Sequence, residues 1–261
     1  MENSPYLFGD FDVAEFCLIA FFLFFAGLIF YLRREDRREG YPLEDDVTGR
    51  QEPLGGLFFT AKPKTFVLPH GHGTRTYPNP GNRDQRTLAA RRSAPMDGAP
   101  IEPTGNPLVD GIGPGSYAER PHYPDATIEG HAKIVPMRLA SDFHLSPQDP
   151  DPRGMTMLGC DGQVAGIVTD AWVDKSEVII RYLEVAVGGE TGRKVVIPMT
   201  MVVVSGSKKT VRTQTVTAAQ FADAPALESA DQITLYEEDR VMGYFGGGLL
   251  YATRDRQEPW L

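Results

Sequence analysis

The longest uninterrupted apolar run of the chain lies near its start. No charged side chain occurs from Phe16 to Leu32, and a helix that begins at Val13 would span about 30 Å at 1.5 Å per residue, the thickness of a bilayer core. Acidic residues precede the run and no Lys or Arg does, whereas a secretory signal peptide begins with basic residues. The pattern therefore predicts one retained transmembrane helix over residues 13–32.

Arginines follow the predicted helix directly. Arg33 and Arg34 are its first flanking residues, two more arginines come within the next turn, and nothing basic precedes the run. The cytoplasmic flanks of membrane helices are rich in Lys and Arg. We therefore expect residues 1–12 on the outer side of the membrane and the chain from residue 33 onward in the cytoplasm.

A stretch rich in proline and glycine follows over residues 33–125. Of the 21 prolines, 13 lie between Pro42 and Pro124, and such a density is incompatible with long helices or central strands. Short apolar clusters recur along the stretch, so we expect an extended segment that packs on partner subunits. Basic and aromatic residues close to the membrane are candidates for contact with lipid headgroups. They are Arg33, Arg34, Tyr41, Lys62 and Lys64.

From residue 126 onward the pattern changes to short runs rich in β-branched residues. Residues 154–174 predict two strands that are joined at Asp161-Gly162, a strong hairpin signal. Further strands are predicted within residues 179–187, 194–204 and 211–216. Short strands at this spacing indicate a small closed β-barrel.

A helix is predicted near the C-terminus. Ser229 or Asp231 could cap its start, and the three glycines at 246–248 would end it. The fold class is then one N-terminal transmembrane helix with a mostly β cytoplasmic domain. That domain, with its helix, would cover residues 126–245, and residues 246–261 would form a polar tail.

Composition and motifs exclude several functions. The net charge of −9 and the pI near 5.1 disfavour a nucleic-acid surface, which needs a dense basic patch. The two cysteines form neither a disulfide framework nor a metal motif, and His70 and His72 lack a third ligand at a fixed spacing, so they predict a polar turn. No GxGxxG, P-loop, HExxH or GxSxG motif is present. The sequence therefore predicts no active site of its own.

Several longer motifs resemble one family. They are REGYPLE, KPKTFVLPHGHGT, PTGNPLVDGIGPGS, AKIVPMR, DPDPRGMTMLGCDGQVAGIVTDAWVD, RYLEV and TLYEEDRVMGYFGGGLLYA. Together they resemble the H subunit of the purple-bacterial photosynthetic reaction centre, in the family's order and over nearly the whole chain. The resemblance implies that the β domain is a PRC-barrel.

The resemblance also implies partners and a place. An H subunit binds no cofactor itself, and the bacteriochlorophyll, bacteriopheophytin, quinones and non-haem iron belong to the L and M subunits. It caps the cytoplasmic face of L and M, shields the quinone sites and assists proton transfer to the secondary quinone. The membrane would be the bacterial inner, photosynthetic membrane, with the N-terminus in the periplasm, and antenna polypeptides and lipids would be further partners.

The family's proton-relay residues map onto the turn between two predicted strands. The resemblance implies that Glu177 is the glutamate nearest the secondary-quinone proton path, with Asp174 and Arg181 as its polar neighbours. From the residues alone, the two carboxylates would be interpreted as a solvated turn. The relay role of these three residues therefore depends on the resemblance.

Proton uptake at the surface is assigned by the same resemblance. In the family a cluster of one Asp and two His precedes the KIxPM segment and can bind zinc. Here His131 matches one histidine, Glu129 stands in place of the other, and Thr127 replaces the aspartate, with Asp125 nearby. We expect uptake through His131, Glu129 and Asp125, and no metal site.

Two other classes of protein remain as alternatives. A membrane-tethered PRC-barrel adaptor of another complex would share the barrel but need not share REGYPLE or the extended segment. A PRC-barrel protein that resembles ribosome-maturation factors would be soluble and more basic on one face. The predicted transmembrane helix and the acidic pI disfavour this last class.

Overall fold

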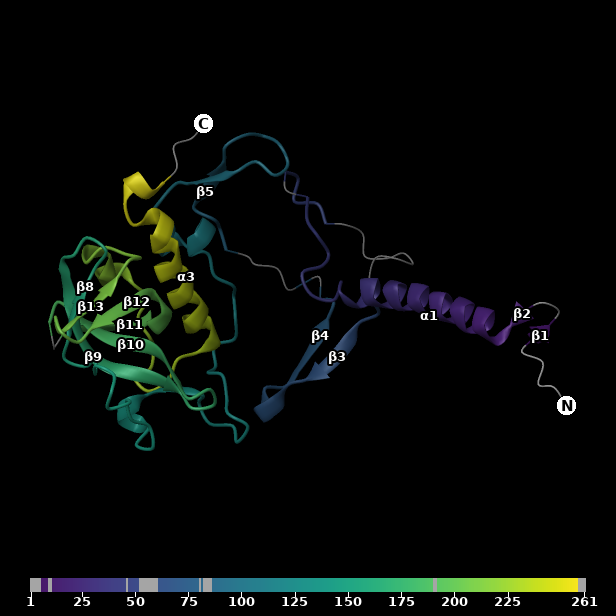
Figure 1. Cartoon of the computed structure of the whole chain (residues 1–261). Helices are drawn as coiled ribbons and strands as arrows, with labels where there is room; N and C mark the ends of the chain where they lie inside the picture. The colour runs from purple at the N-terminus through teal and green to yellow at the C-terminus, as the bar shows by residue number, and fades with distance from the viewer. Residues whose placement is uncertain are drawn as a thin grey trace. The chain divides into compact units, whose positions relative to one another are not determined.

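The computed structural model describes residues 6–8, 11–45, 47–51, 61–79, 81, 86–189 and 192–257. The chain divides into two compact units, residues 1–85 with 95–98 and residues 86–94 with 99–261 (Figure 1). The first unit holds α1 (Val13–Glu35) and two hairpins. These hairpins are formed by β1 (Tyr6–Phe8) with β2 (Phe11–Asp12), and by β3 (Lys64–Val67) with β4 (Thr74–Tyr77).

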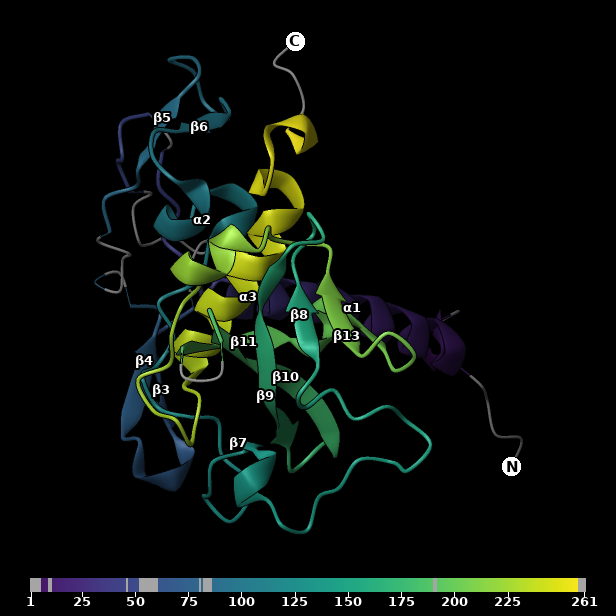
Figure 2. The ribbon, with the colours of Figure 1, turned by 90° about the vertical axis from the view of Figure 1, so that its left-hand side faces the viewer.

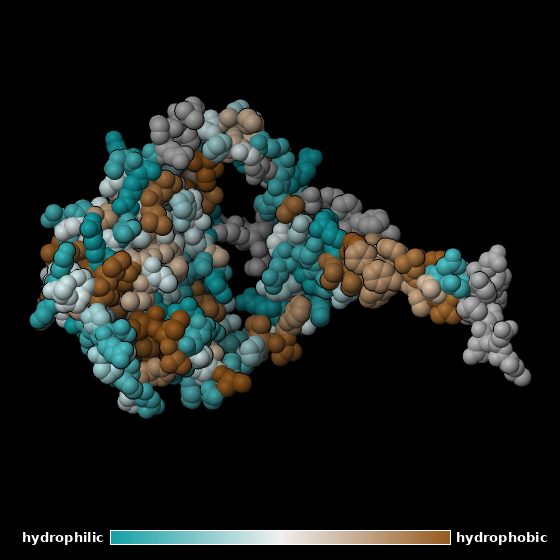
Figure 3. Space-filling model, viewed as in Figure 1, coloured by the Kyte–Doolittle hydropathy of each residue, from teal (hydrophilic) through white to brown (hydrophobic). Residues whose placement is uncertain are grey.

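Helix α1 begins where the sequence predicts the span to begin. Asp12 accepts a hydrogen bond from the Glu15 amide and Glu15 accepts one from the Asp12 amide, a capping box that satisfies two free N–H groups. None of the helix is buried within the chain, and Figure 3 shows apolar residues along it. Among the described residues α1 is the one helix long and apolar enough to cross a membrane.

The β3–β4 hairpin is tied to the end of α1. Arg38 forms an ion pair with Glu35 at 2.7 Å and donates hydrogen bonds to the carbonyl oxygens of Lys62 and Tyr77. His70 lies in the turn between the two strands, within a 3₁₀ helix (Pro69–Gly71), and both His70 and His72 are exposed. This location agrees with the predicted polar turn.

The second unit is built on one seven-stranded sheet. Its order is β11-β10-β9-β8-β13-β12, and β7 pairs with the end of β9 on the edge opposite β10 (Figure 2). The strands are β7 (Ile134–Pro136), β8 (Thr156–Leu158), β9 (Val164–Asp174), β10 (Ile179–Val187), β11 (Arg193–Pro198), β12 (Val202–Ser205) and β13 (Thr210–Thr213). All pairings are antiparallel except that of β8 with β13.

The predicted strands are confirmed, with one division. The predicted strand at 194–204 is two strands, β11 and β12, separated by a 3₁₀ helix (Met199–Met201) that follows Pro198. Within the described ranges no pairing joins β11 to β12, the two ends of this strand order. The fold class is as predicted, an apolar N-terminal helix and a mostly β domain with a C-terminal helix.

Smaller elements complete the second unit. A hairpin is formed by β5 (Ala90–Arg92) and β6 (Ile101–Pro103), and the short helix α2 (Pro107–Asp110) precedes a 3₁₀ helix (Gly113–Gly115). Further 3₁₀ helices are Met137–Leu139, Ala219–Asp223 and Arg254–Arg256. The largest fully buried side chains of the core include Trp172, Phe221 and Phe245.

The C-terminal helix α3 (Leu235–Tyr251) differs from its predicted bounds. Thr234, rather than Ser229 or Asp231, caps it, in a capping box with Glu237. The glycines at 246–248 lie inside the helix, so the prediction that they end it is wrong. A Cβ at Gly247 would lie 2.7 Å from Cα of Gly115, so close packing of two backbones requires glycine there.

Candidate functional site

The turn between β9 and β10 carries the predicted relay residues. Asp174 ends β9, its side chain is fully buried, and its Oδ1 accepts hydrogen bonds from the amides of Ser176 and Glu177, both at 2.9 Å. These two bonds close the turn in the way that aspartate commonly does. They also place the Glu177 side chain beside the strand end, where it is 49% exposed.

The lysine that precedes β7 completes this site. The pairing of Ile134 with Asp174 brings the start of β7 to the end of β9. As a result, Nζ of Lys133 lies 3.3 Å from Oε1 of Glu177 and 3.4 Å from Oδ2 of Asp174. The same Nζ lies 3.5 Å from Oδ2 of Asp125. One cation thus contacts three carboxylates.

Arg181 contacts two of these three carboxylates, those of Asp174 and Glu177. Its Nε lies 3.3 Å from Oδ2 of Asp174, and its Nη2 lies 3.0 Å from Oε2 of Glu177. The structure therefore brings the three predicted relay residues together with Asp125 and Lys133. These five residues are called the relay cluster below.

Two pKa shifts show how the relay cluster is charged. Burial of Asp174 would raise the pKa of its carboxyl, but the two amide hydrogen bonds and the charges of Lys133 and Arg181 outweigh burial and lower that pKa. Partial burial of Lys133 would lower the pKa of its ammonium, but Glu177, Asp174 and Asp125 raise it instead. At neutral pH, Asp174 and Lys133 therefore hold fixed charges of opposite sign.

A carboxyl group near the relay cluster has the opposite behaviour. Glu238 of α3 accepts a hydrogen bond from the hydroxyl of Tyr182 at 3.0 Å. Burial raises the pKa of Glu238 and outweighs the hydrogen bond from Tyr182 and the charge of Arg181, which both lower it. A carboxyl that is held closer to neutrality can bind and release a proton, which the strongly ionised Asp174 does poorly.

The predicted uptake residues divide into two groups. Asp125 belongs to the relay cluster, whereas Glu129 and His131 are exposed on the loop that leads to Lys133. This loop is a tight turn in which the Thr127 amide donates to the His131 carbonyl. The loop therefore places titratable groups at the surface, in the segment of chain that leads to the relay cluster. Among the residues that the structure describes, no group of three or more His, Cys, Asp or Glu has an arrangement suited to a metal ion.

The residues proposed for lipid contact lie in the first unit. Arg33 forms an exposed ion pair with Asp36 at 3.1 Å, the guanidinium of Arg37 lies over the ring of Tyr41, and Lys64 lies over the ring of Phe66. Arg34 lies in the last turn of α1, and the carbonyl of Lys62 accepts a hydrogen bond from Arg38. Their contact with lipid stays a prediction.

A second charged group lies in the middle of β9 and β10, and it is here called the core network. Nη1 of Arg138 lies 3.0 Å from Oδ2 of Asp170 and 3.4 Å from Oε2 of Glu184. Lys194 Nζ lies 2.7 Å from Oε1 of Glu184, whose side chain is 4% exposed. Trp172 donates its indole N–H to the same carboxylate. Sequence patterns did not reveal this network.

Comparison with protein families agrees with this architecture. Residues 148–219 match the PRC-barrel domain, which covers most of the sheet and places the chain in the class of PRC-barrel proteins. Residues 5–139 match the N-terminal region of the photosynthetic reaction centre H-chain. That match covers more than half of the chain, and the chain belongs to the reaction-centre H-chain family.

Family membership decides between the alternatives left by the sequence. The H-chain match includes α1 and the extended segment, which an unrelated PRC-barrel adaptor need not contain. The chain is thus a membrane-anchored subunit of a reaction centre. The relay cluster draws residues from both matched regions, since Asp125 and Lys133 lie in the first, and Asp174, Glu177 and Arg181 lie in the second.

Proposed function

We propose that this subunit caps the cytoplasmic face of the L and M subunits, shields their quinone sites and assists proton transfer to the secondary quinone. Quinones, bacteriochlorophyll, bacteriopheophytin and non-haem iron would be bound by those partners, and this chain would contribute no active site. The observation that carries the proposal is the convergence of three carboxylates on Lys133 Nζ, within 3.5 Å, beside a solvent-exposed loop with titratable groups.

The proposed division of labour follows from burial. Asp174 stays ionised and holds Lys133 and Arg181 in place, so it acts as a positioning residue. Glu177 and Asp125 are about half exposed, so water reaches both carboxylates. Lys133 contacts both carboxylates, so the two groups belong to one continuous set of polar side chains. His131 and Glu129 would take part in proton uptake at the surface, where both side chains are exposed.

The relay proposal is tested by Glu177→Gln in the purified reaction centre. We expect the second, proton-coupled electron transfer to the secondary quinone to slow by about tenfold, because one proton acceptor is lost. The first electron transfer, which takes up no proton onto the quinone, should keep its rate. Flash-induced absorption changes measure both steps.

Glu228→Gln is the matched control for this experiment. Glu228 is an exposed carboxylate outside the relay cluster, and its replacement should leave both rates unchanged. Equal rates of both transfers in Glu177→Gln and the parent would remove Glu177 from the relay.

Assembly is tested by purification of a tagged chain from photosynthetically grown cells in mild detergent. Bacteriochlorophyll that co-purifies and bleaches reversibly in a flash is the expected result. A colourless preparation with the chain intact would instead support the membrane-tethered adaptor.

The proposed orientation has the N-terminus in the periplasm and the domain in the cytoplasm. It is supported by the arginines at the C-terminal end of α1, since basic flanks stay inside. Protease should therefore digest the β domain in inside-out vesicles and spare it in intact spheroplasts. Digestion in spheroplasts would reverse the orientation.

A further inference from the structure

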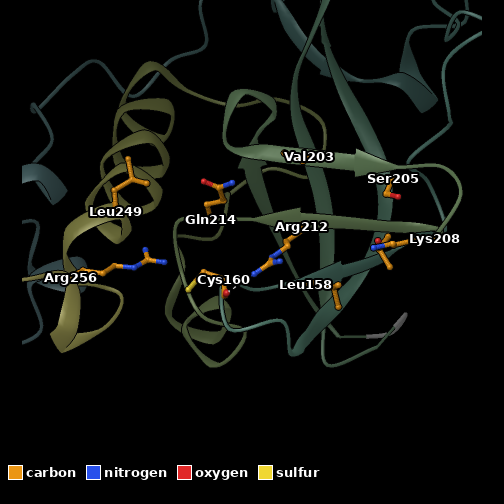
Figure 4. Close-up of a pocket in the computed structure, with 10 residues that line it drawn as sticks. Leu158, Cys160, Val203, Ser205, Lys208, Arg212, Gln214, Leu249 and Arg256 are labelled. Atoms are coloured by element: carbon orange, nitrogen blue, oxygen red, sulfur yellow. Dashed lines mark hydrogen bonds between the residues drawn. The ribbon is translucent and has the colours of Figure 1, made fainter.

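A groove of about 790 Å³ lies on the second unit (Figure 4), and no residue of the relay cluster lines it. Its floor is one face of β8, β13 and β12, and its wall is the end of α3 with the 3₁₀ helix that follows. The lining residues are Leu158, Cys160, Val203, Ser205, Lys208, Thr210, Arg212, Gln214, Leu249 and Arg256. The volume is within the range of ligand sites in proteins.

Strand register explains why these side chains share one face. Arg212 of β13 pairs with Val203 of β12 on one side and with Leu158 of β8 on the other, which forms one row across three strands. Val211, the neighbour of Arg212, is fully buried in the core on the opposite face. The row Leu158–Arg212–Val203 is therefore the outer face of the sheet, and Val203 is 61% exposed.

The groove is cationic although the chain is acidic. Lys208, Arg212 and Arg256 line it, no described carboxylate does, and none of these three cations forms an ion pair with another described residue. The chain as a whole carries a net charge of −9. An acidic ligand would thus be repelled by most of the surface and attracted here.

The three cations are spread along the groove. Figure 4 shows Lys208 at the turn at one end, Arg256 at the other end and Arg212 between them. Arg212 is oriented by its hydrogen bond to the Cys160 carbonyl at 3.0 Å, and Arg256 by its bond to the Thr215 carbonyl at 2.8 Å. Separated, pre-oriented cations match several carboxylates along an extended chain better than one compact phosphate.

We propose that this groove binds an extended acidic segment of a partner polypeptide. Carboxylates of the segment would pair with Lys208, Arg212 and Arg256. Apolar side chains on the same face of the segment would cover Val203 and Leu249, which are both 61% exposed. The outer edge of β12 is unpaired in the described part of the sheet and offers backbone groups beside the groove.

The test uses the full chain in non-ionic detergent and a fluorescein-labelled octapeptide of repeated Glu-Glu-Leu-Leu, which presents both residue types on each face of an extended chain. Fluorescence anisotropy at low ionic strength should show saturable binding of this peptide and none of its Lys–Leu counterpart. The double variant Lys208→Glu/Arg212→Glu should weaken binding by at least about tenfold. Val203→Asp, an exposed change that leaves the core intact, should weaken it as well.

The control is Lys209→Glu/Arg254→Glu, which makes the same change in net charge at two exposed residues outside the lining. It should change the affinity by no more than about twofold. Equal weakening by this control, or no binding of the acidic peptide to the parent chain, would overturn the proposal. Displacement of the peptide by phosphatidylglycerol micelles, but not by unlabelled acidic peptide, would identify a lipid site instead.

Discussion

Two charged groups flank the short strand β7 and differ in how far their carboxylates are exposed to solvent. Lys133 precedes β7 and contacts the relay cluster, whereas Arg138 follows β7 and contacts the core network. Both cations meet carboxylates of β9. In the core network, however, Glu184 is 4% exposed and lies directly opposite Asp170 in the sheet. In the relay cluster only Asp174 is buried, and its partners reach solvent.

The difference separates a stabilising charged group from the proposed relay cluster within one sheet. Burial of Glu184 would raise the pKa of its carboxyl, but Lys194, Thr169 and Arg138 lower it, so its charge is permanent and fully paired. Such a group cannot release or accept a proton without disrupting the fold. The relay cluster is at the strand ends, where the carboxylates of Glu177 and Asp125 are about half exposed.

The largest expected effect comes from breaking the core network. Glu184→Ala leaves Arg138 and Lys194 without their shared partner, so the free energy of unfolding should fall by about 3 kcal/mol. Urea titration followed by Trp172 fluorescence in a Trp260→Phe background measures this loss. The exposed control Glu228→Ala should cost under about 0.5 kcal/mol. A similar cost for both variants would contradict the structural role of the core network.

A smaller effect is expected for Asp174→Asn. Asn keeps an oxygen for the two turn amides but loses the charge that pairs with Lys133 and Arg181, so we expect a loss of about 1 kcal/mol at pH 7. The pKa of Asp174 is lowered in the folded chain. Its contribution is therefore complete above the unfolded pKa of about 3.9 and is lost as pH falls through the lower folded pKa.

The pH dependence provides the control for Asp174→Asn. The parent should lose stability below about pH 4, and the variant should lose less over the same window. Urea midpoints at pH 7 and pH 3 measure the difference. Asp149→Asn, a change at an exposed carboxylate outside both groups, should follow the parent at both pH values. A variant as acid-sensitive as the parent would show that Asp174 is not ionised in the folded chain.

The smallest effect, with the opposite sign, is expected for Glu238→Gln. The raised pKa of Glu238 means that the fold favours its protonated form, so ionised Glu238 reduces stability above its unfolded pKa of about 4.3. Gln keeps the acceptor for the Tyr182 hydroxyl and removes the charge. Stability at pH 7 should rise by up to about 1 kcal/mol, and the gain should vanish below pH 4. A clear loss at pH 7 would place Glu238 in a paired network instead.

Local signals predicted much of the fold. The uncharged run places α1, and the Asp161-Gly162 turn places β8 and β9, because both are determined by residues close in sequence. The extent of α3 could not be predicted in this way. Its glycines would usually end a helix, but packing of Gly247 on Gly115 depends on a contact between distant parts of the chain.

The candidate site was predictable only in part, for the same reason. The resemblance assigned Glu177, Asp174 and Arg181, but Lys133 joins them only because β7 pairs with β9. The burial that raises the pKa of Glu238 likewise depends on how α3 packs. Resemblance also implied roles for His131 and Glu129, and these roles remain predictions.

The glycine contacts of α3 have a consequence for the order of events during synthesis. Gly243 and Gly247 lie against Gly115 and Ser116. Gly115 and Ser116 are synthesised more than a hundred residues before these two glycines of α3. At typical elongation rates the earlier segment waits for roughly ten seconds. Helix α1 could enter the membrane within that time, while the segment that follows it still lacks its packing partner. The last-made helix would then complete the domain on a chain that is already anchored.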